Sequence, residues 1–277
     1  MAKLTRKLWA GIGIATIAGS PLTGPAQAQQ EPHKHQAGSP NAAAQDGAAA
    51  KNPAEGGEAY LTDGGPKDTR IRFYRDIELI RGHLLIGQQL IALNLWDEAL
   101  PHFLHPTEEL YNLIEKYIQL HNIRPFKREL QALAQAVKAK RKGAYEQALK
   151  VVDQRLTGAL DVGKKFMTPV RNFTVRSAVE VLRVAQSEYE ASIEDGKFKL
   201  PVEYQDSRGF VWQAEQMFEG AAPDLSRIDE ESLQRIRASL AKLKSAWPEP
   251  MPPEQPVLQV SEIAGLISDI ELHISRY

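Results

Sequence analysis

Apolar residues recur at spacings of three and four along the chain beyond its N-terminal quarter, with little sustained alternation. This period is typical of amphipathic helices, whose apolar side chains form one stripe. The clearest stripe lies in residues 70–95 and contains Phe73, Ile77, Ile80 and Leu84. The spacing therefore predicts a long first helix of about 39 Å, at 1.5 Å per residue.

Prolines, glycines and capping residues divide the rest of the pattern into further helices. Pro106 is predicted to begin a new helix with His105 in the cap position, and Asp229 is predicted to cap a later one. Five prolines between residues 248 and 256 predict an extended connector before the last helix. The predicted helices after the first occupy residues 97–104, 106–121, 125–143, 145–166, 172–196, 202–218, 229–247 and 261–275.

This order of elements predicts an all-α fold built as an antiparallel helical bundle. No region has the pattern of a strand-rich segment. Two packed four-helix units, over residues 67–167 and 168–277, fit the number of helices, and a single elongated bundle fits almost as well.

The first 28 residues have the three parts of a secretory signal peptide. A basic start precedes an apolar stretch over residues 8–18, and Ala26-Gln27-Ala28 forms a small-x-small cleavage site. The apolar stretch has about half of the roughly 20 residues that a membrane span requires. We therefore expect export to the periplasm, with no membrane insertion after cleavage of residues 1–28; an uncleaved anchor is the alternative.

Residues 29–66 are rich in Ala, Gly, Pro, Gln and Asn and nearly free of branched aliphatic residues. Such a segment buries too little apolar area to offset the entropy of ordering, so we expect a disordered linker. The pair His33 and His35 in this linker is at most a weak metal site, and a chance pair is the simpler interpretation.

Composition and charge exclude several functions. The chain of 277 residues has 34 Lys plus Arg, 35 Asp plus Glu and no Cys. The balanced charge gives no basic footprint for nucleic-acid binding. The lack of cysteine excludes disulfides, thiolate metal sites and iron–sulfur clusters. The sequence also lacks the Gly-x-Ser-x-Gly, phosphate-loop and His-Glu-x-x-His motifs, so we expect a protein that is not an enzyme.

Histidines and acidic residues gather in one part of the helical region. His102 and His105 lie three residues apart, so a helical turn places them on one face. If Pro106 begins a helix, Glu108 lies close to His105, as the two side chains of a capping box do, and Glu109 follows it. His83 reaches the same place if its helix pairs antiparallel with the next.

Together these side chains, His83, His102, His105, Glu108 and Glu109, are candidate metal ligands. Imidazoles with a carboxylate suit iron, zinc or copper better than calcium or magnesium. The alternative is purely structural: proline followed by acidic residues is also an ordinary helix start, and the histidines are then hydrogen-bonded core residues.

A second polar group occurs in residues 203–209. Glu203 and Asp206 share a helix face, and Arg208 could pair with either. As an ordinary solvated helix start the ion pair is worth under about 1 kcal/mol. As part of a site, this segment would bring carboxylates from the second helical unit towards the first.

The segment His105-Pro106-Thr107-Glu108 resembles the His-x-x-Glu motif of the imelysin-like family. The connector over residues 247–256, followed by a final amphipathic helix, is also similar. The resemblance implies an exported protein of two helical bundles that binds metal through His105 and Glu108. It also implies a role like that of the periplasmic component of a bacterial iron-uptake system.

These observations predict a periplasmic metal-binding protein for uptake or handling of iron or a similar transition metal. Its partners would be the metal ion and an envelope or membrane transport protein. The alternative is a helical interaction or scaffold protein of the cell envelope without bound metal.

Overall fold

The computed structural model describes residue 61 and residues 65–277. The predicted signal peptide, residues 1–28, and nearly all of the predicted linker, residues 29–66, lie outside the described residues.

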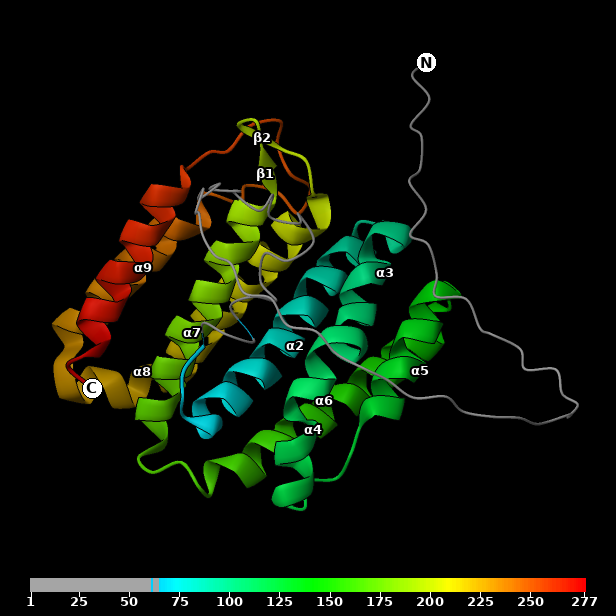
Figure 1. Cartoon of the computed structure of the whole chain (residues 1–277), viewed down its shortest axis with the longest axis horizontal. Helices are drawn as coiled ribbons and strands as arrows, with labels where there is room; N and C mark the ends of the chain where they lie inside the picture. The colour runs from blue at the N-terminus through cyan, green and yellow to red at the C-terminus, as the bar shows by residue number, and fades with distance from the viewer. Residues whose placement is uncertain (1–60, 62–64) are drawn as a thin grey trace, which may run out of the picture. The chain divides into compact units, whose positions relative to one another are not determined.

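The described part of the chain is almost entirely helical, which confirms the all-α prediction (Figure 1). The α-helices are α2 (Thr69–Ala92), α3 (Trp96–His105), α4 (Tyr111–Leu120), α5 (Lys127–Lys138), α6 (Lys142–Lys164), α7 (Val170–Ala191), α8 (Pro201–Lys244) and α9 (Val260–Ile274). A π-helical turn, η2 (Pro106–Leu110), joins α3 to α4.

Helix α2 is the common element of the structure. It packs against α3, α4 and α6 from the N-terminal group of helices, and against α7 and α8 from the C-terminal part (Figure 1). The predicted apolar stripe explains this position, since Phe73, Ile77, Ile80 and Leu84 are all buried. Because α2 packs on both groups of helices, the division into units at residue 167 stays a prediction.

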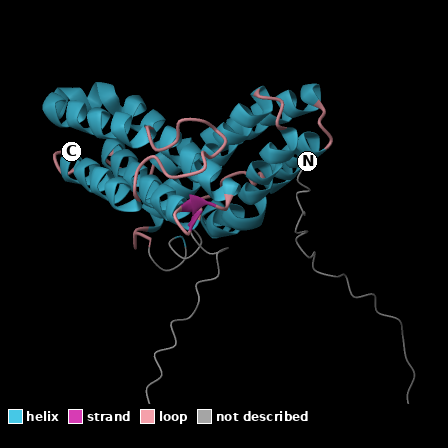
Figure 2. Cartoon of the chain, turned by 90° about the horizontal axis from the view of Figure 1, so that it is seen from above, coloured by secondary structure: helices cyan, strands magenta, loops and turns pink. Residues whose placement is uncertain are grey.

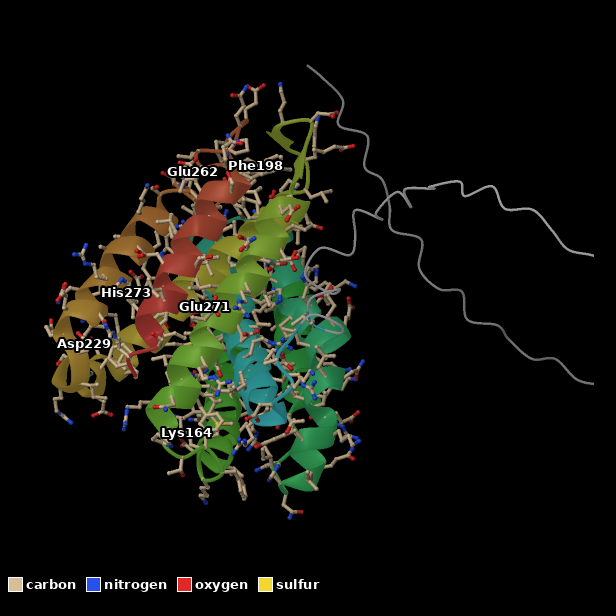
Figure 3. The ribbon with its side chains drawn as sticks, turned by 60° about the vertical axis from the view of Figure 1, so that its left-hand side comes forward. Lys164, Phe198, Asp229, Glu262, Glu271 and His273 are labelled. Carbon is tan, nitrogen blue, oxygen red and sulfur yellow. The ribbon has the colours of Figure 1, made fainter. Side chains whose placement is uncertain are left out.

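The C-terminal part forms four helical segments, because α8 is bent at Asp229 (φ −153°, ψ 92°; Figure 3). The Asp229 carboxylate accepts hydrogen bonds from the backbone N–H and the hydroxyl of Ser232, as a helix cap does. The cap predicted at this residue is therefore confirmed. The helix before it continues past Phe218 and through Pro223, which the sequence pattern did not predict.

A small hairpin follows α7, where the sequence predicted only the end of a helix. Strand β1 (Ile193–Glu194) pairs antiparallel with β2 (Lys197–Phe198), the only sheet among the described residues (Figure 2). Asp195 and Gly196 turn the chain with φ of 52° and 71°. Asp-Gly is a favoured pair for such a turn, because both positions need positive φ.

No helix in residues 65–277 is both long enough and apolar enough to cross a membrane.

Candidate metal centre

The candidate site lies where α2 packs against α8. A Cβ on Gly82 in α2 would lie 2.6 Å from Cδ1 of Phe210, and a Cβ on Gly209 in α8 would clash with the carbonyl oxygen of Gly82. Only glycine permits so close an approach of two backbones. The approach places His83, next to Gly82, beside Asp206, which lies one helical turn before Gly209.

Three imidazoles converge on one carboxylate. Nδ1 of His83 and Nδ1 of His102 lie 2.6 Å and 2.7 Å from Oδ1 of Asp206. Nδ1 of His105 lies 3.1 Å from Oδ2 of the same residue. His83, His102 and Asp206 are buried, and His105 is partly exposed, so the group has one side towards solvent. The predicted convergence of His83, His102 and His105 is thus present in the structure.

His83, His105 and Asp206 have the geometry of a metal-ligand group. Each offers one ligand atom, and these atoms all lie within 4.8 Å of one another. Ligands of a single transition-metal ion lie at most about 4.2 Å apart, twice a bond of about 2.1 Å. Closing the group around an ion therefore requires movements below about 1 Å.

His102 occupies a different position in the group. Its Nδ1 faces Asp206, and its Nε2 lies 2.9 Å from Oε1 of Gln205. The Gln205 amide nitrogen in turn donates to the Met251 sulfur. Both ring nitrogens of His102 thus face protein acceptors, so this residue orients Asp206 and leaves no nitrogen for an ion.

Electrostatic interactions within the group shift its pKa values. Burial raises the pKa of Asp206, but attraction to His83, His102 and His105 outweighs it and holds that pKa well below its ordinary value. Burial lowers the pKa of His83 more than Asp206 raises it. For His105 the balance is opposite: burial lowers the pKa, but Asp206 and Glu109 raise it to about 9.

Further carboxylates surround this group. Glu109 Oε1 lies 3.7 Å from Nε2 of His105. The pKa of Glu188 is raised well above its ordinary value, mainly by burial and then by the negative charges of Asp206, Glu203 and Glu109. Burial also raises the pKa of Glu203, as does Asp206. Such mutual repulsion in a poorly solvated place is relieved by a bound cation.

Glu108 is not brought into the group. Its side chain is exposed, and its carboxylate is not among the ligand atoms that gather around Asp206. The prediction assumed that His105 caps a new helix, but His105 is itself helical (φ −50°, ψ −42°) and makes no side-chain cap bond. The N–H of Tyr111 bonds the carbonyl of Pro106 five residues back, so the turn is wider than an α turn and Glu108 lies off the face of His105.

The polar group at residues 203–209 contributes to the candidate site. Asp206 does bring a carboxylate from the C-terminal helices to the histidines. Arg208 forms no ion pair with it; its guanidinium donates to the Trp247 carbonyl and to Gln89, and stacks on Trp212. Gln205 lies within this polar group, but its contact with His102 was not predicted, and no sequence signal indicated Glu188, because only the packing of helices brings both residues to the site.

Residues 167–277 match the family model described as the Iron permease-associated 4-helix bundle domain. The match covers about two fifths of the chain and coincides with α7, both arms of α8, and α9. Comparisons with curated proteins and with solved structures give no match. The matched family is not the imelysin-like one, so that resemblance stays a prediction, whereas a connection to iron uptake is common to both.

Proposed function

We propose that this protein binds iron or a similar transition metal in the periplasm, for uptake or handling of the ion, and that His83, His105 and Asp206 are its ligands. The ion is cargo, and the protein binds it without chemical turnover.

One observation carries the proposal: ligand atoms from α2, α3 and α8 lie within 4.8 Å of one another in a largely buried place. Buried ionisable groups are costly unless they are paired or hold an ion. Because α8 lies far from α2 and α3 in the sequence, these ligand atoms converge only in the folded chain and do not form a local motif.

The donor set determines which ions suit the site. Two imidazoles and one carboxylate with open positions favour iron(II), and also suit zinc and copper. Glu109, Glu188 and Glu203 are close enough to interact electrostatically with the group. A bound cation would lower the raised pKa values of Glu188 and Glu203 and so give the site compensating negative charge. This charge favours a cation and disfavours an anionic ligand.

A membrane transporter is the proposed partner. The description of the matched domain, associated with an iron permease, supports this, and the imelysin-like resemblance supports the same iron-uptake context. The signal-peptide pattern of residues 1–28 supports a periplasmic location.

The test is metal titration of the purified exported chain after chelator treatment, with iron(II) under anaerobic conditions, zinc and copper. Calorimetry and elemental analysis should give one ion per chain. His83→Ala and His105→Ala should lose binding, whereas Glu108→Ala and His273→Ala should retain it. His273 is the matched histidine control, since it lies in α9 beside Asp269. Equal metal content in all these variants would end the proposal.

A second candidate function is a helical scaffold or interaction protein without metal. It is favoured by the hydrogen bonds of Asp206, which already satisfy both carboxylate oxygens with histidines. Thermal unfolding separates the two candidates. A ligand present at 100 times its Kd adds about 2.7 kcal/mol to the unfolding free energy, and a scaffold gains nothing from added metal.

A further inference from the structure

A cavity of about 710 Å³ lies at the N-terminal end of α2, beside α4 and the residues that follow α6. Three large apolar side chains of its lining are exposed, namely Leu113 (39%), Phe166 (48%) and Leu120 (73%). Exposed apolar side chains that gather in one place mark a surface that contacts another molecule or a membrane. The cavity shares no residue with the candidate metal centre.

Lys116 lies between the two leucines on one strip of α4. In an α-helix, positions 113, 116 and 120 lie within about 60° of one another around the axis. Glu115 is the one acidic residue of α4, and it lies about 130° from the middle of this strip, so it faces away from it. The strip therefore presents apolar side chains and a cation together, as helices in a membrane interface do.

The basic residues at this cavity outnumber the acidic ones. Two of its arginines are neutralised by aspartates, in the pairs Arg70–Asp68 and Arg75–Asp76. Arg72, Lys116 and Lys165, which adjoins Phe166 in the sequence, form no ion pair with any residue that the structure describes. We call these three cations and the three exposed apolar residues the α4 rim.

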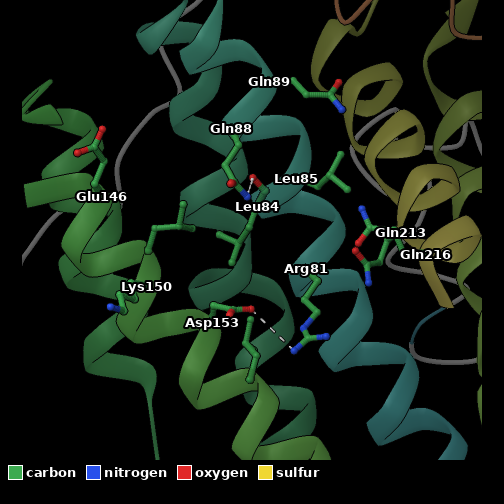
Figure 4. A pocket seen from close by; sticks show the side chains of 12 residues that line it. Arg81, Leu84, Leu85, Gln88, Gln89, Glu146, Lys150, Asp153, Gln213 and Gln216 are labelled. Atoms are coloured by element: carbon green, nitrogen blue, oxygen red, sulfur yellow. Dashed lines mark hydrogen bonds and ion pairs between the residues drawn. The ribbon is translucent and has the colours of Figure 1, made fainter. Parts of the chain in front are cut away.

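The cavity between α2, α6 and α8, of about 650 Å³, differs in both respects (Figure 4). Its four leucines are buried or partly buried, so no large apolar side chain projects from it. Its two basic residues, Arg81 and Lys150, are balanced by Glu146 and Asp153. Exposed apolar residues and unpaired cations thus coincide at the α4 rim and not at this second cavity.

We propose that the α4 rim is a peripheral docking surface for a bilayer of anionic phospholipids. Arg72, Lys116 and Lys165 attract the negative headgroups, and their apolar stems lie along the headgroup layer. Leu120 and Phe166 enter that layer, where exposed apolar side chains leave water. The lysines favour lipid over a protein partner, because the centres of protein–protein interfaces are depleted in lysine.

Docking through the α4 rim leaves the metal centre outside the lipid. His83 follows Arg72 by eleven residues in α2, which corresponds to about 16 Å of helix. The docking does not depend on metal binding, and the two proposals fail or succeed separately. If both hold, the protein carries its ion close to the bilayer in which a transporter lies.

Vesicle flotation tests the docking with defined lipids. The purified exported chain is mixed with vesicles of phosphatidylglycerol and phosphatidylcholine in equal parts, and with vesicles of phosphatidylcholine alone. We expect partitioning onto the anionic vesicles to be at least about 30-fold stronger, because three cations contribute near an anionic surface. Salt should weaken it, since salt screens exposed charges. Equal partitioning onto the two kinds of vesicle would overturn the proposal. A lack of binding to the anionic vesicles would also overturn it and would assign the α4 rim to a protein partner.

Matched variants locate the cations that bind lipid. The double variant Lys116→Gln/Lys165→Gln should weaken partitioning onto the anionic vesicles roughly 10- to 30-fold. Its control is Lys150→Gln/Lys199→Gln, which removes two exposed lysines that form no ion pair among the described residues and lie outside the α4 rim. An equal loss in the two double variants would show attraction by overall charge and would overturn the assignment to the α4 rim.

An apolar substitution and a fluorescent label test the role of the leucine. Leu120→Asn should weaken partitioning about threefold to tenfold, and Leu272→Asn in α9, where the leucine is 67% exposed, should not. Because the chain has no cysteine, Leu120→Cys and Leu272→Cys each carry a single environment-sensitive dye. Anionic vesicles should shift the emission to the blue at position 120 and not at position 272.

Circular dichroism of each variant confirms that the helices are retained. An equal emission shift at the two labelled positions, or unchanged partitioning of Leu120→Asn, would overturn the entry of Leu120 into the headgroup layer and with it the proposed orientation.

Discussion

The two groups of helices differ in what they contribute to the candidate metal centre. Helices α2 and α3 supply three histidines but lie outside the matched residues 167–277. The matched bundle supplies Asp206, together with Gln205, but none of these histidines. A family match to the bundle therefore describes only half of this candidate site, and its side chains converge because α2 packs against α8.

The contact between the two groups is itself a specific feature. Gly82 and Gly209 permit the backbones of α2 and α8 to approach, and this approach sets the distance from His83 to Asp206. Substitutions can separate the contributions of the two groups of helices. They change the carboxylate from the bundle (Asp206), the glycine contact (Gly209), the histidine that orients Asp206 (His102), and a polar contact away from the site (Glu78).

The largest effect is expected for Asp206→Asn, which removes the bundle's ligand. Metal binding should be lost, and the unfolding free energy should fall by about 3–5 kcal/mol, as when one partner of a buried ionic group is removed. Calorimetry and urea unfolding measure the two effects.

Its control is Asp224→Asn, on the same helix. Asp224 is exposed and, among the residues that the structure describes, forms an ion pair only with Arg227, so its loss should cost under about 1 kcal/mol. If the Asp206→Asn variant bound metal with the affinity of the parent protein, the histidines would form a site without a ligand from the bundle.

The next effect concerns the glycine contact. Gly209→Ala places a methyl group against the Gly82 carbonyl, which should cost about 1–3 kcal/mol through overpacking and weaken metal binding by separating His83 from Asp206. Gly220→Ala, also in α8, meets no atom within 4 Å and should stabilise the protein by about 0.5–1 kcal/mol. Equal stability changes in the two variants would contradict the role of the contact.

Much of the fold was predictable from the sequence because its signals are local. The apolar stripe of α2, the cap at Asp229 and the connector after Trp247 all depend on residues within one or two turns. The π turn at Pro106 was not predictable, because its register depends on how the following residues pack. A new helical element does begin at Pro106 directly after His105, as predicted, but His105 makes no side-chain cap bond and Glu108 lies away from the site.

The site was only half predictable. His83, His102 and His105 lie close together in sequence, and antiparallel packing of neighbouring helices was enough to expect their convergence. The sequence places Asp206 in a separate polar group, because more than a hundred residues separate it from these histidines and no local pattern indicates that α8 lies against α2. Helix packing, and not spacing, determines this part of the site.

A smaller effect is expected for His102→Asn. Asparagine can still donate to Asp206, but it loses the bond to Gln205. Residues that orient a ligand typically affect metal affinity 10- to 100-fold, so we expect a loss of about tenfold, measured by competition with a chelator. His273→Asn in α9 is the control (Figure 3). A complete loss, as in His105→Ala, would instead make His102 a ligand.

The smallest effect tests a polar contact between α2 and α8 away from the metal centre. Glu78 in α2 is buried and accepts a hydrogen bond from Gln213 in α8. Burial raises the pKa of Glu78, more than Arg81 lowers it. The unfolded chain therefore releases this proton at lower pH than the folded one, so the unfolding free energy falls as pH rises from the ordinary glutamate pKa to the raised one.

Glu78→Gln keeps an acceptor for Gln213 and removes this dependence. It should stabilise the protein by up to about 1 kcal/mol at neutral pH, with the gain vanishing towards pH 4. Urea unfolding across this range measures it, and Glu115→Gln, at an exposed position of α4, should show no such trend. A gain that is independent of pH would show that Glu78 is stabilised by its partners across the contact and not strained by burial.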